Sequence, residues 1–257
     1  MDYKKKAVYF FCTDYERDEV APRVLDYLKN NYPLKLSNTK FDNRDIYNYV
    51  DENNNLFTYV ETDKVLSYDY DKYIPLLSKL FSDYNVAGVV NWHGGEKAPD
   101  KILTVHSTGD VVGGIYAPSN PLYLRNLLVS MEKHREENHL DDFKVMTEGT
   151  HWTGTIRGGD INLIDKYEVP LFDIEIGSTL ESWSNEIAVK TLSTSLQDVF
   201  SDEGPIADSI IGNIDGIVIH DNLKSGYKNQ IKKLAQELNV PTFKHKKLRT
   251  PKDLPIW

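Results

Sequence analysis

The chain has 257 residues, of which 40% are hydrophobic, enough to bury the core of one large α/β domain. Its net charge of −9 excludes a protein that coats nucleic acid through a general positive charge. The single cysteine, Cys12, excludes an internal disulfide framework, and no apolar run approaches the roughly 20 residues that span a bilayer. We therefore expect a soluble, cytoplasmic monomer in which residues 1–257 form a single domain.

The first third of the chain has the pattern of a doubly wound α/β unit. Residues 7–12 form a short apolar run typical of a buried strand, and Pro22 is placed for the first turn of the helix that follows. Residues 46–50 and 56–60 flank a cluster rich in Asp and Asn, which predicts a hairpin at a sheet edge. A helix over residues 70–84 then leads into the next strand.

Two short apolar runs that follow each end in a histidine. Residues 86–90 are β-branched or small, as in a strand buried on both faces, and they lead to His93. Residues 102–105 lead in the same way to His106. Because ligands bind at the carboxyl ends of buried strands in α/β proteins, these two histidines predict a functional site.

The helix predicted after the second of these strands has Pro121 in its first turn and a charged end. His134 and His139 lie in that charged end. We expect both to face water near the helix C-terminus, and we assign them no functional role.

A third histidine has a setting similar to that of the first two. Residues 143–146 form a short strand candidate that runs into Glu148 and His151. The glycine-rich residues 153–160 that follow are expected to form a mobile flap.

The next strand carries two carboxylates in an otherwise apolar run. Over residues 169–177, a period of two places Asp173 and Glu175 on one face and large apolar residues on the other. A helix over residues 182–200 and a last strand over residues 214–219 complete the alternating pattern.

The histidines and carboxylates at these strand ends could converge when the chain folds. Neutral histidine can act as a general base or as a metal ligand, and histidine together with carboxylate suits Zn²⁺. The sequence has no HExxH or CxxC spacing, so the ligands could come together only through the fold. The residues alone leave open a metal centre, an acid–base site and a set of core histidines that only form hydrogen bonds.

Four motifs follow one another in a fixed order along the chain. They are His93 after its strand, TVHSTG at residues 104–109, EGTH at residues 148–151, and EIGS at residues 175–178 followed by Trp183. Together they resemble the motifs of the archaeal and plant type of D-aminoacyl-tRNA deacylase. The similarity covers most of the chain from about residue 86 to residue 243.

The resemblance implies an α/β fold with a mixed central β-sheet flanked by helices, similar to phosphorylase and peptidyl-tRNA hydrolase folds. It implies hydrolysis of the ester bond of D-aminoacyl-tRNA, such as D-tyrosyl-tRNA, which releases D-amino acid and free tRNA as a proofreading step. Archaeal members are zinc-dependent, so zinc is the expected cofactor and the tRNA acceptor end the expected partner. The basic stretches at residues 228–238 and 244–252 could hold tRNA phosphates or could simply be solvated surface.

The site residues implied by the resemblance lie in the motifs and in the turns next to them. The expected catalytic residues are His106, His151, Glu148 and Thr108. The expected metal ligands are His93, His106, His151 and Glu175. The expected substrate-binding residues are Gly94, Gly95, Thr104, Gly109, Thr150, Gly177 and Ser178.

Several positions depart from the family pattern. Trp152 stands where the family has a second adjacent histidine, Trp92 where it has an arginine, and Asp110 where its turn ends in asparagine. A glycine-rich segment of the family, before the last strand, is missing from the sequence. Two alternatives therefore stand beside a divergent deacylase: a metal-dependent hydrolase of a small ester or amide, and a noncatalytic binding protein of the same fold.

Overall fold

The computed structural model describes residues 2–95, 98–152 and 160–201, together with residues 217–219, 228–229, 232–233, 235–236 and 242–244. It divides the chain into two compact units, Met1–Ser201 and Asp202–Trp257, which are described separately. A single domain over residues 1–257 stays a prediction.

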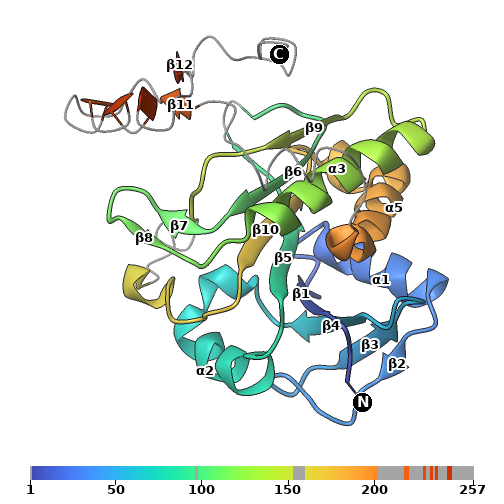
Figure 1. Cartoon of the computed structure of the whole chain (residues 1–257). Helices are drawn as coiled ribbons and strands as arrows, with labels where there is room; N and C mark the ends of the chain where they lie inside the picture. The colour runs from blue at the N-terminus through green and yellow to red at the C-terminus, as the bar shows by residue number, and fades with distance from the viewer. Residues whose placement is uncertain are drawn as a thin grey trace. The chain divides into compact units, whose positions relative to one another are not determined.

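The first unit contains an eight-stranded sheet (Figure 1). Its strands are β1 (Lys6–Cys12), β2 (Lys35–Leu36), β3 (Ile46–Val50), β4 (Leu56–Thr62), β5 (Val86–Trp92), β6 (Ile102–Ser107), β9 (Lys144–Thr147) and β10 (Leu171–Ile176). They lie in the order β2-β3-β4-β1-β5-β10-β6-β9. Strands β4, β1, β5 and β10 run parallel, whereas β6 is antiparallel to β10 and parallel to the edge strand β9. The predicted mixed α/β sheet is confirmed, as is the predicted hairpin, formed by β3 and β4.

The first unit has five α-helices among its described residues, and the first three form close to the ranges that the apolar pattern predicts. The five helices are α1 (Ala21–Asn31), α2 (Tyr70–Leu80), α3 (Pro121–Glu137), α4 (Leu180–Trp183) and α5 (Glu186–Ser195), with 3₁₀ turns η1 (Leu66–Tyr68), η3 (Ile161–Leu163) and η4 (Leu196–Phe200). Helix α2 ends at Leu80, earlier than predicted. The single helix predicted over residues 182–200 is wrong, because Asn185 accepts hydrogen bonds from two backbone N–H groups and starts α5 as a separate helix.

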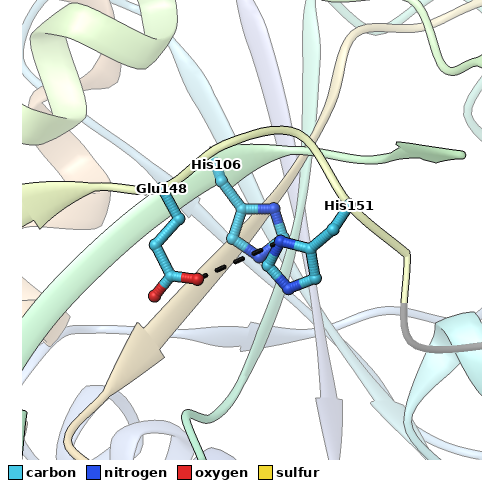
Figure 2. Close-up of side chains that lie close together, drawn as sticks. All are labelled: His106, Glu148 and His151. Atoms are coloured by element: carbon cyan, nitrogen blue, oxygen red, sulfur yellow. Dashed lines mark ion pairs between the residues drawn. The ribbon is translucent and has the colours of Figure 1, made fainter. Parts of the chain in front are cut away.

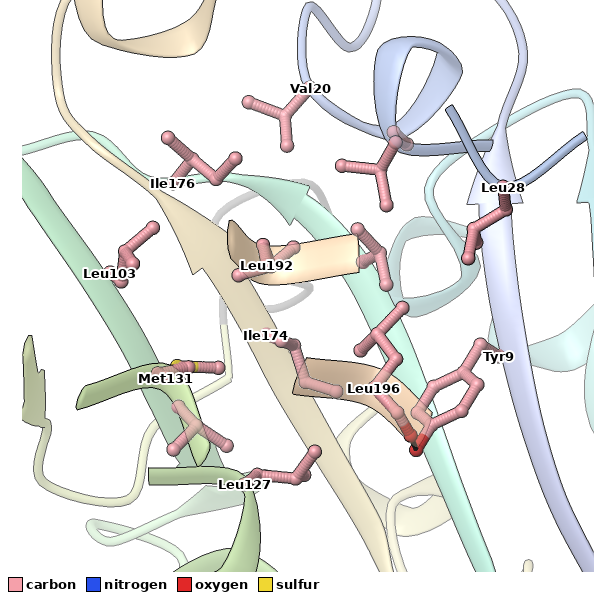
Figure 3. Close-up of a cluster of buried hydrophobic side chains, with 14 of the residues drawn as sticks. Tyr9, Val20, Leu28, Leu103, Leu127, Met131, Ile174, Ile176, Leu192 and Leu196 are labelled. Atoms are coloured by element: carbon pink, nitrogen blue, oxygen red, sulfur yellow. Dashed lines mark hydrogen bonds between the residues drawn. The ribbon is translucent and has the colours of Figure 1, made fainter. Parts of the chain in front are cut away.

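The larger core lies between one face of the sheet and helices α1, α3 and α5 (Figure 3). Ile174 and Ile176 of β10 pack there with Leu192 of α5. Each fully buried side chain of this kind contributes about 1.5–3 kcal/mol to the free energy of unfolding. The Tyr9 hydroxyl donates to the Leu196 carbonyl at 2.6 Å, which satisfies a polar group inside this core.

Helix α2 covers part of the opposite face, where a second apolar cluster forms. Tyr73, Ile74 and Leu77 of α2 belong to this cluster, as do Ala87 and Val89 of β5. We call this face of the sheet the α2 face. In the part of the chain that the structure describes, no helix has the length and apolar content to cross a membrane.

Some predicted segments fall partly outside the described residues. In the predicted flap, residues 153–159 lie outside them. In the second unit, β11 (Ile217–Ile219) lies within the predicted last strand and pairs in parallel with β12 (Thr242–Lys244). Most of the two basic stretches, residues 228–238 and 244–252, also lies outside the described residues.

His134 does not simply face water, contrary to the expectation. Its Nε2 lies 2.9 Å from Asp198 Oδ2, and its Nδ1 lies 2.9 Å from Glu137 Oε2. The Ser130 hydroxyl donates to the same Asp198 oxygen at 2.7 Å. His134 therefore joins α3 to η4, a structural contact that residue spacing along α3 alone does not reveal.

Candidate active site

The site is built on the α2 face of the sheet, where polar side chains replace the apolar ones. Two rows of registered residues cross strands β5, β10 and β6 there. One row is Asn91, Glu175 and Thr104, and the other is Val89, Asp173 and His106. As predicted, Asp173 and Glu175 share a face, while Phe172, Ile174 and Ile176 pack in the larger core.

The expectation that His93 and His106 both lie at one carboxyl edge of the sheet is wrong. Strand β6 is antiparallel to β10, so it ends at the opposite edge from β5. His106 lies opposite Asp173 in the middle of β10, whereas His93 follows the last residue of β5. The histidines come together across the α2 face, because alternate residues of neighbouring strands project to the same side.

His93 lies between a carboxylate and a hydroxyl. Its Nε2 is 2.6 Å from Glu148 Oε1, and its Nδ1 is 2.7 Å from Ser178 Oγ. Burial by itself lowers the pKa of His93, but the hydrogen bond to Glu148 and the charges of Glu148 and Glu175 outweigh it and raise the pKa. For Glu148, burial by itself raises the pKa, but the hydrogen bond to His93 and the charges of the nearby histidines outweigh it and lower the pKa.

His106 is 2% exposed and has one ring nitrogen without a hydrogen-bond partner among the described residues. Its Nδ1 is 3.1 Å from the Ser107 carbonyl, while its Nε2 is 3.9 Å from Glu175 Oε1. Burial lowers the pKa of His106, but the nearby carboxylates of Glu175 and Asp173 outweigh it and raise the pKa from 6.5 to about 9. Burial also raises the pKa of Glu175.

His151 stacks on His106, with ring centroids 3.9 Å apart and an interplanar angle of 22° (Figure 2). Its Nδ1 is 3.0 Å from the Gly149 carbonyl and 4.0 Å from Glu148 Oε2. An isolated β-bridge to Thr108 and a hydrogen bond from the Gly109 N–H hold its backbone next to the end of β6.

Two overlapping groups of side chains could hold a metal ion. His106, Glu148 and His151 form one, and His93, Glu148 and Glu175 form the other, with the ligand atoms of each within 4.8 Å of one another. All four predicted metal ligands occur in these groups, and Glu148 is common to both. The buried Nε2 of His106, which has no hydrogen-bond partner in the described part of the chain, fits a metal ligand.

Polar side chains near the histidines form hydrogen bonds with the two carboxylates of β10. The Thr108 hydroxyl donates to Asp173 Oδ2 at 2.8 Å, which anchors the start of the turn after β6. The Asn91 carboxamide lies between the two carboxylates of β10. Its amide group donates to Asp173 Oδ1 at 3.5 Å or, when rotated by half a turn, to Glu175 Oε1 at 2.9 Å.

The residues predicted to bind substrate do not all lie in one place. Gly94 and Gly95 follow His93 and are exposed. Thr104 is fully buried and registered with Glu175. The others lie close to a histidine: Gly109 and Thr150 beside the backbone of His151, and Gly177 and Ser178 in the turn next to His93.

Asp18 is a site neighbour that the sequence pattern did not single out. It is 1% exposed, and its Oδ1 accepts hydrogen bonds from the Val20 and Ala21 N–H groups at 2.8 Å each. Burial raises the pKa of Asp18 to about 7, the two backbone hydrogen bonds oppose the rise, and the charge of Glu175 adds to it. The available signal was a carboxylate just before the helix that Pro22 starts.

Trp92 and Trp152, the two tryptophans expected to depart from the family pattern, are packing residues. Trp152 is 5% exposed and stacks on Tyr70, with ring centroids 5.5 Å apart. Trp92 packs edge-on against Trp183, with ring centroids 5.3 Å apart. With Trp152 packed in this way, His106 and His151 form one metal-capable group with Glu148, and His93 forms another with Glu148 and Glu175.

Among the comparisons with known proteins, a family model shows the family and a solved structure shows the fold. A sequence model of the family described as D-aminoacyl-tRNA deacylase matches residues 80–212. No curated protein sequence matches the chain significantly. The crystal structure of a conserved protein of unknown function is similar at 19% identity, covering 98% of this chain and 99% of that chain with a TM-score of 0.66, which shows a shared fold.

Two more distant structures are similar over part of the chain. A 5'-methylthioadenosine/S-adenosylhomocysteine nucleosidase from Neisseria meningitidis is 10% identical, covering 78% of this chain and 100% of that chain with a TM-score of 0.45. A futalosine hydrolase mutant of Helicobacter pylori is 10% identical, covering 79% of this chain and 100% of that chain with a TM-score of 0.44.

Proposed function

The chain belongs to the D-aminoacyl-tRNA deacylase family, and from this premise we propose that it hydrolyses the ester between a D-amino acid and the terminal ribose of tRNA. The products are a free D-amino acid and free tRNA. The observation that carries the proposal is the convergence of His93, His106 and His151 with Glu148 and Glu175 on one face of the sheet, within the matched region. Ester hydrolysis needs a proton acceptor and a stabiliser of the oxyanion, and this set of side chains can supply both.

We propose that the reaction is metal-assisted and that zinc is the metal. His106, Glu148 and His151 would hold it, because the Nε2 of His106 is buried with no hydrogen-bond partner in the described residues and both neighbours offer ligand atoms. When bound, zinc would act as a Lewis acid and lower the pKa of a coordinated water. The second group, His93, Glu148 and Glu175, is the alternative ligand set.

The remaining roles follow from position. Thr108 holds the turn after His106 through Asp173, so we propose that it positions His106 rather than reacting itself. The backbone next to His151, at Gly109 and Thr150, and the turn at Gly94 and Gly95 would contact the aminoacyl end of the tRNA. We place the reaction in the cytoplasm, with the protein acting as a monomer.

A hydrolase of a small ester is the second candidate. The net charge of −9 favours it, because a polyanionic tRNA gains little from an acidic protein outside a local basic patch. The same side chains would serve both substrates, since the reacting bond is an ester in each case. A noncatalytic role fits less well. His106, whose pKa is raised, and the side chains that could hold a metal ion lie together on one face of the sheet, as they do in active sites.

The direct test is deacylation of D-tyrosyl-tRNA by the purified protein, with L-tyrosyl-tRNA as the stereochemical control. We expect hydrolysis of the D-ester, bound zinc by metal analysis, and loss of activity by on the order of 10²-fold or more on chelation and in His106→Ala. His139→Asn is the matched control, because it removes an exposed histidine outside the site at a left-handed position that asparagine tolerates. An intact D-ester with a hydrolysed small ester would favour the second candidate.

A further inference from the structure

Ser178 lies beside His93 although the two are 85 positions apart in the sequence. The cause is the register of two neighbouring parallel strands, in which Ile176 of β10 lies opposite Trp92 of β5. The residues that follow each strand therefore emerge side by side at the same edge. Their contact is short, with Ser178 Oγ 2.7 Å from His93 Nδ1.

The direction of the hydrogen bonds follows from the third member of the group, Glu148. An ionised carboxylate can only accept, so the Nε2–H of His93 donates to Glu148 Oε1 at 2.6 Å. When the imidazole is neutral, its other nitrogen, Nδ1, has a free lone pair and can accept a hydrogen bond from the Ser178 hydroxyl, 2.7 Å away. A hydroxyl, a base that accepts its proton and an acid that orients the base are the parts of an activated nucleophile.

The turn that carries Ser178 is held tightly in place. Gly177 has φ of +38°, and a Cβ at this position would lie 2.2 Å from the Ser182 Cβ, so only glycine fits. The Ser178 N–H donates to the Asp100 carbonyl at 2.9 Å.

Trp183 fixes that turn relative to His93. Its indole N–H lies 3.0 Å from the His93 carbonyl and 2.9 Å from the Gly177 carbonyl, so one donor spans the segments that carry the base and the hydroxyl. Preorganisation of this kind is what a reacting pair requires.

We propose that Ser178 is the nucleophile of the deacylation and forms a covalent aminoacyl-enzyme; this rests on the proposed function for the identity of the acyl group. Ser178 Oγ attacks the ester carbonyl carbon while its proton passes to His93 Nδ1. The bond from that carbon to the ribose oxygen then breaks, and the ribose oxygen leaves with the proton from His93. A water hydrolyses the serine ester by the same route, with His93 as base, and returns Ser178 to its free form.

The proposal is compatible with one of the two candidate ligand sets and excludes the other. Ligation through His106, Glu148 and His151 leaves both ring nitrogens of His93 free for the contacts described. Ligation through His93 Nε2 would make Nδ1 the donor, so Ser178 would accept a hydrogen bond and only orient the ring. The chemical fate of Ser178 therefore distinguishes the two arrangements.

The experiment treats the purified full-length protein with a fluorophosphonate, which phosphonylates an activated serine with loss of fluoride, and locates the adduct by peptide mass spectrometry. We expect wild type to be labelled at Ser178, with labelling abolished in Ser178→Ala and slowed by about 10²–10⁴-fold in Glu148→Gln. Ser184→Ala is the matched control, because among the described residues its hydroxyl donates to the Leu180 and Glu181 carbonyls of α4, and it should label as wild type does.

Deacylation of D-tyrosyl-tRNA is measured on the same variants and separates the two proposals. Ser178→Ala should lower kcat by about 10³-fold or more if Ser178 is the nucleophile. Active wild type that is not labelled at Ser178, together with Ser178→Ala that retains kcat within about tenfold, overturns the nucleophile but leaves the deacylase intact. Labelling at Ser178 without D-tyrosyl-tRNA hydrolysis overturns the proposed substrate and keeps the nucleophile. If wild type shows neither labelling at Ser178 nor hydrolysis of D-tyrosyl-tRNA, the nucleophile and the substrate are both overturned.

Discussion

Asp18 is a carboxylic acid with one oxygen satisfied by the backbone and the other buried with no hydrogen-bond partner in the described residues. The fold disfavours its ionised form, because burial raises its pKa to about 7, well above the ordinary value near 3.8. A raised carboxyl pKa contributes stability at low pH, and that contribution is lost as the pH rises from about 4 to about 7. Asp18 therefore makes the folded state less stable on the alkaline side of this window.

Replacing Asp18 by asparagine should separate the charge from the hydrogen bonds. Asp18→Asn keeps an oxygen for the Val20 and Ala21 N–H groups and cannot ionise, so its unfolding free energy relative to wild type should increase between about pH 4 and pH 8. The rise of the Asp18 pKa from 3.8 to about 7 corresponds to a change on the order of 2–4 kcal/mol in the free energy of unfolding. Thermal unfolding of the chelator-treated proteins across this range measures it, and a difference that does not change with pH contradicts it. Asp18→Ala, which loses the capping oxygen, should be less stable by about 1 kcal/mol where the wild-type carboxyl is neutral.

Single residues could be predicted from the sequence where a short strand leads directly to them. His93 and Glu148 each follow a strand that its apolar run predicts, and the structure places their side chains in contact. Ser178 was expected to bind substrate, but its contact with His93 could not be predicted, because it depends on which strands are neighbours in the sheet. Asp18 was missed for the same reason, since its electrostatic neighbour Glu175 lies far along the chain.

At the scale of elements, the direction of β6 decides the shape of the site. The pattern of residues 102–107 predicts a strand but carries no information on its direction, and a short apolar strand fits a parallel or an antiparallel neighbour. The helices were predicted best where a cap marks their start, as Asn120 does for α3. The break between α4 and α5 was missed because the apolar pattern continues across it, while Asn185 redirects the backbone.

Substitution of Gly177, in the turn after β10, tests how strongly the position of Ser178 depends on the conformation of that turn. Gly177→Ala should lower the free energy of unfolding by about 2–4 kcal/mol, because it combines a left-handed φ with a clash against Ser182, and it should displace Ser178. Gly114→Ala is the matched control: its φ is +72°, but a Cβ there meets nothing within 4 Å, so only the strain of about 1–2 kcal/mol applies. Chemical denaturation of both variants gives the comparison, and equal losses would show that the clash is relieved by movement of α4.

For the whole molecule, the distribution of charge sets how a tRNA would be held. The net charge of −9 opposes a polyanion in general, whereas lysines concentrate in residues 224–252. If the proposed tRNA substrate is bound, we expect few phosphate contacts, and the salt dependence of binding counts them.

Removal of three of these charges should reduce that dependence. In the triple variant Lys228→Gln, Lys232→Gln, Lys233→Gln, the slope of log K against log salt concentration for tRNA binding should become shallower by about 0.7–0.9 for each phosphate that is no longer neutralised. Hydrolysis of a small ester should not change. Binding titrations at several salt concentrations measure the slope, and a slope equal to that of wild type would place the tRNA-binding residues elsewhere on the surface.

The indole pair of Trp92 and Trp183 gives this site an optical signal of its own. Their rings lie 5.3 Å apart at 60°, close enough for their electronic transitions to couple, and the Trp183 N–H touches the carbonyls of both His93 and Gly177. The part of the near-ultraviolet circular dichroism that this pair contributes would therefore report whether the two segments that carry the base and the hydroxyl are assembled. Loosening of the active site during heating could then be followed separately from the melting of the helices, without an added label.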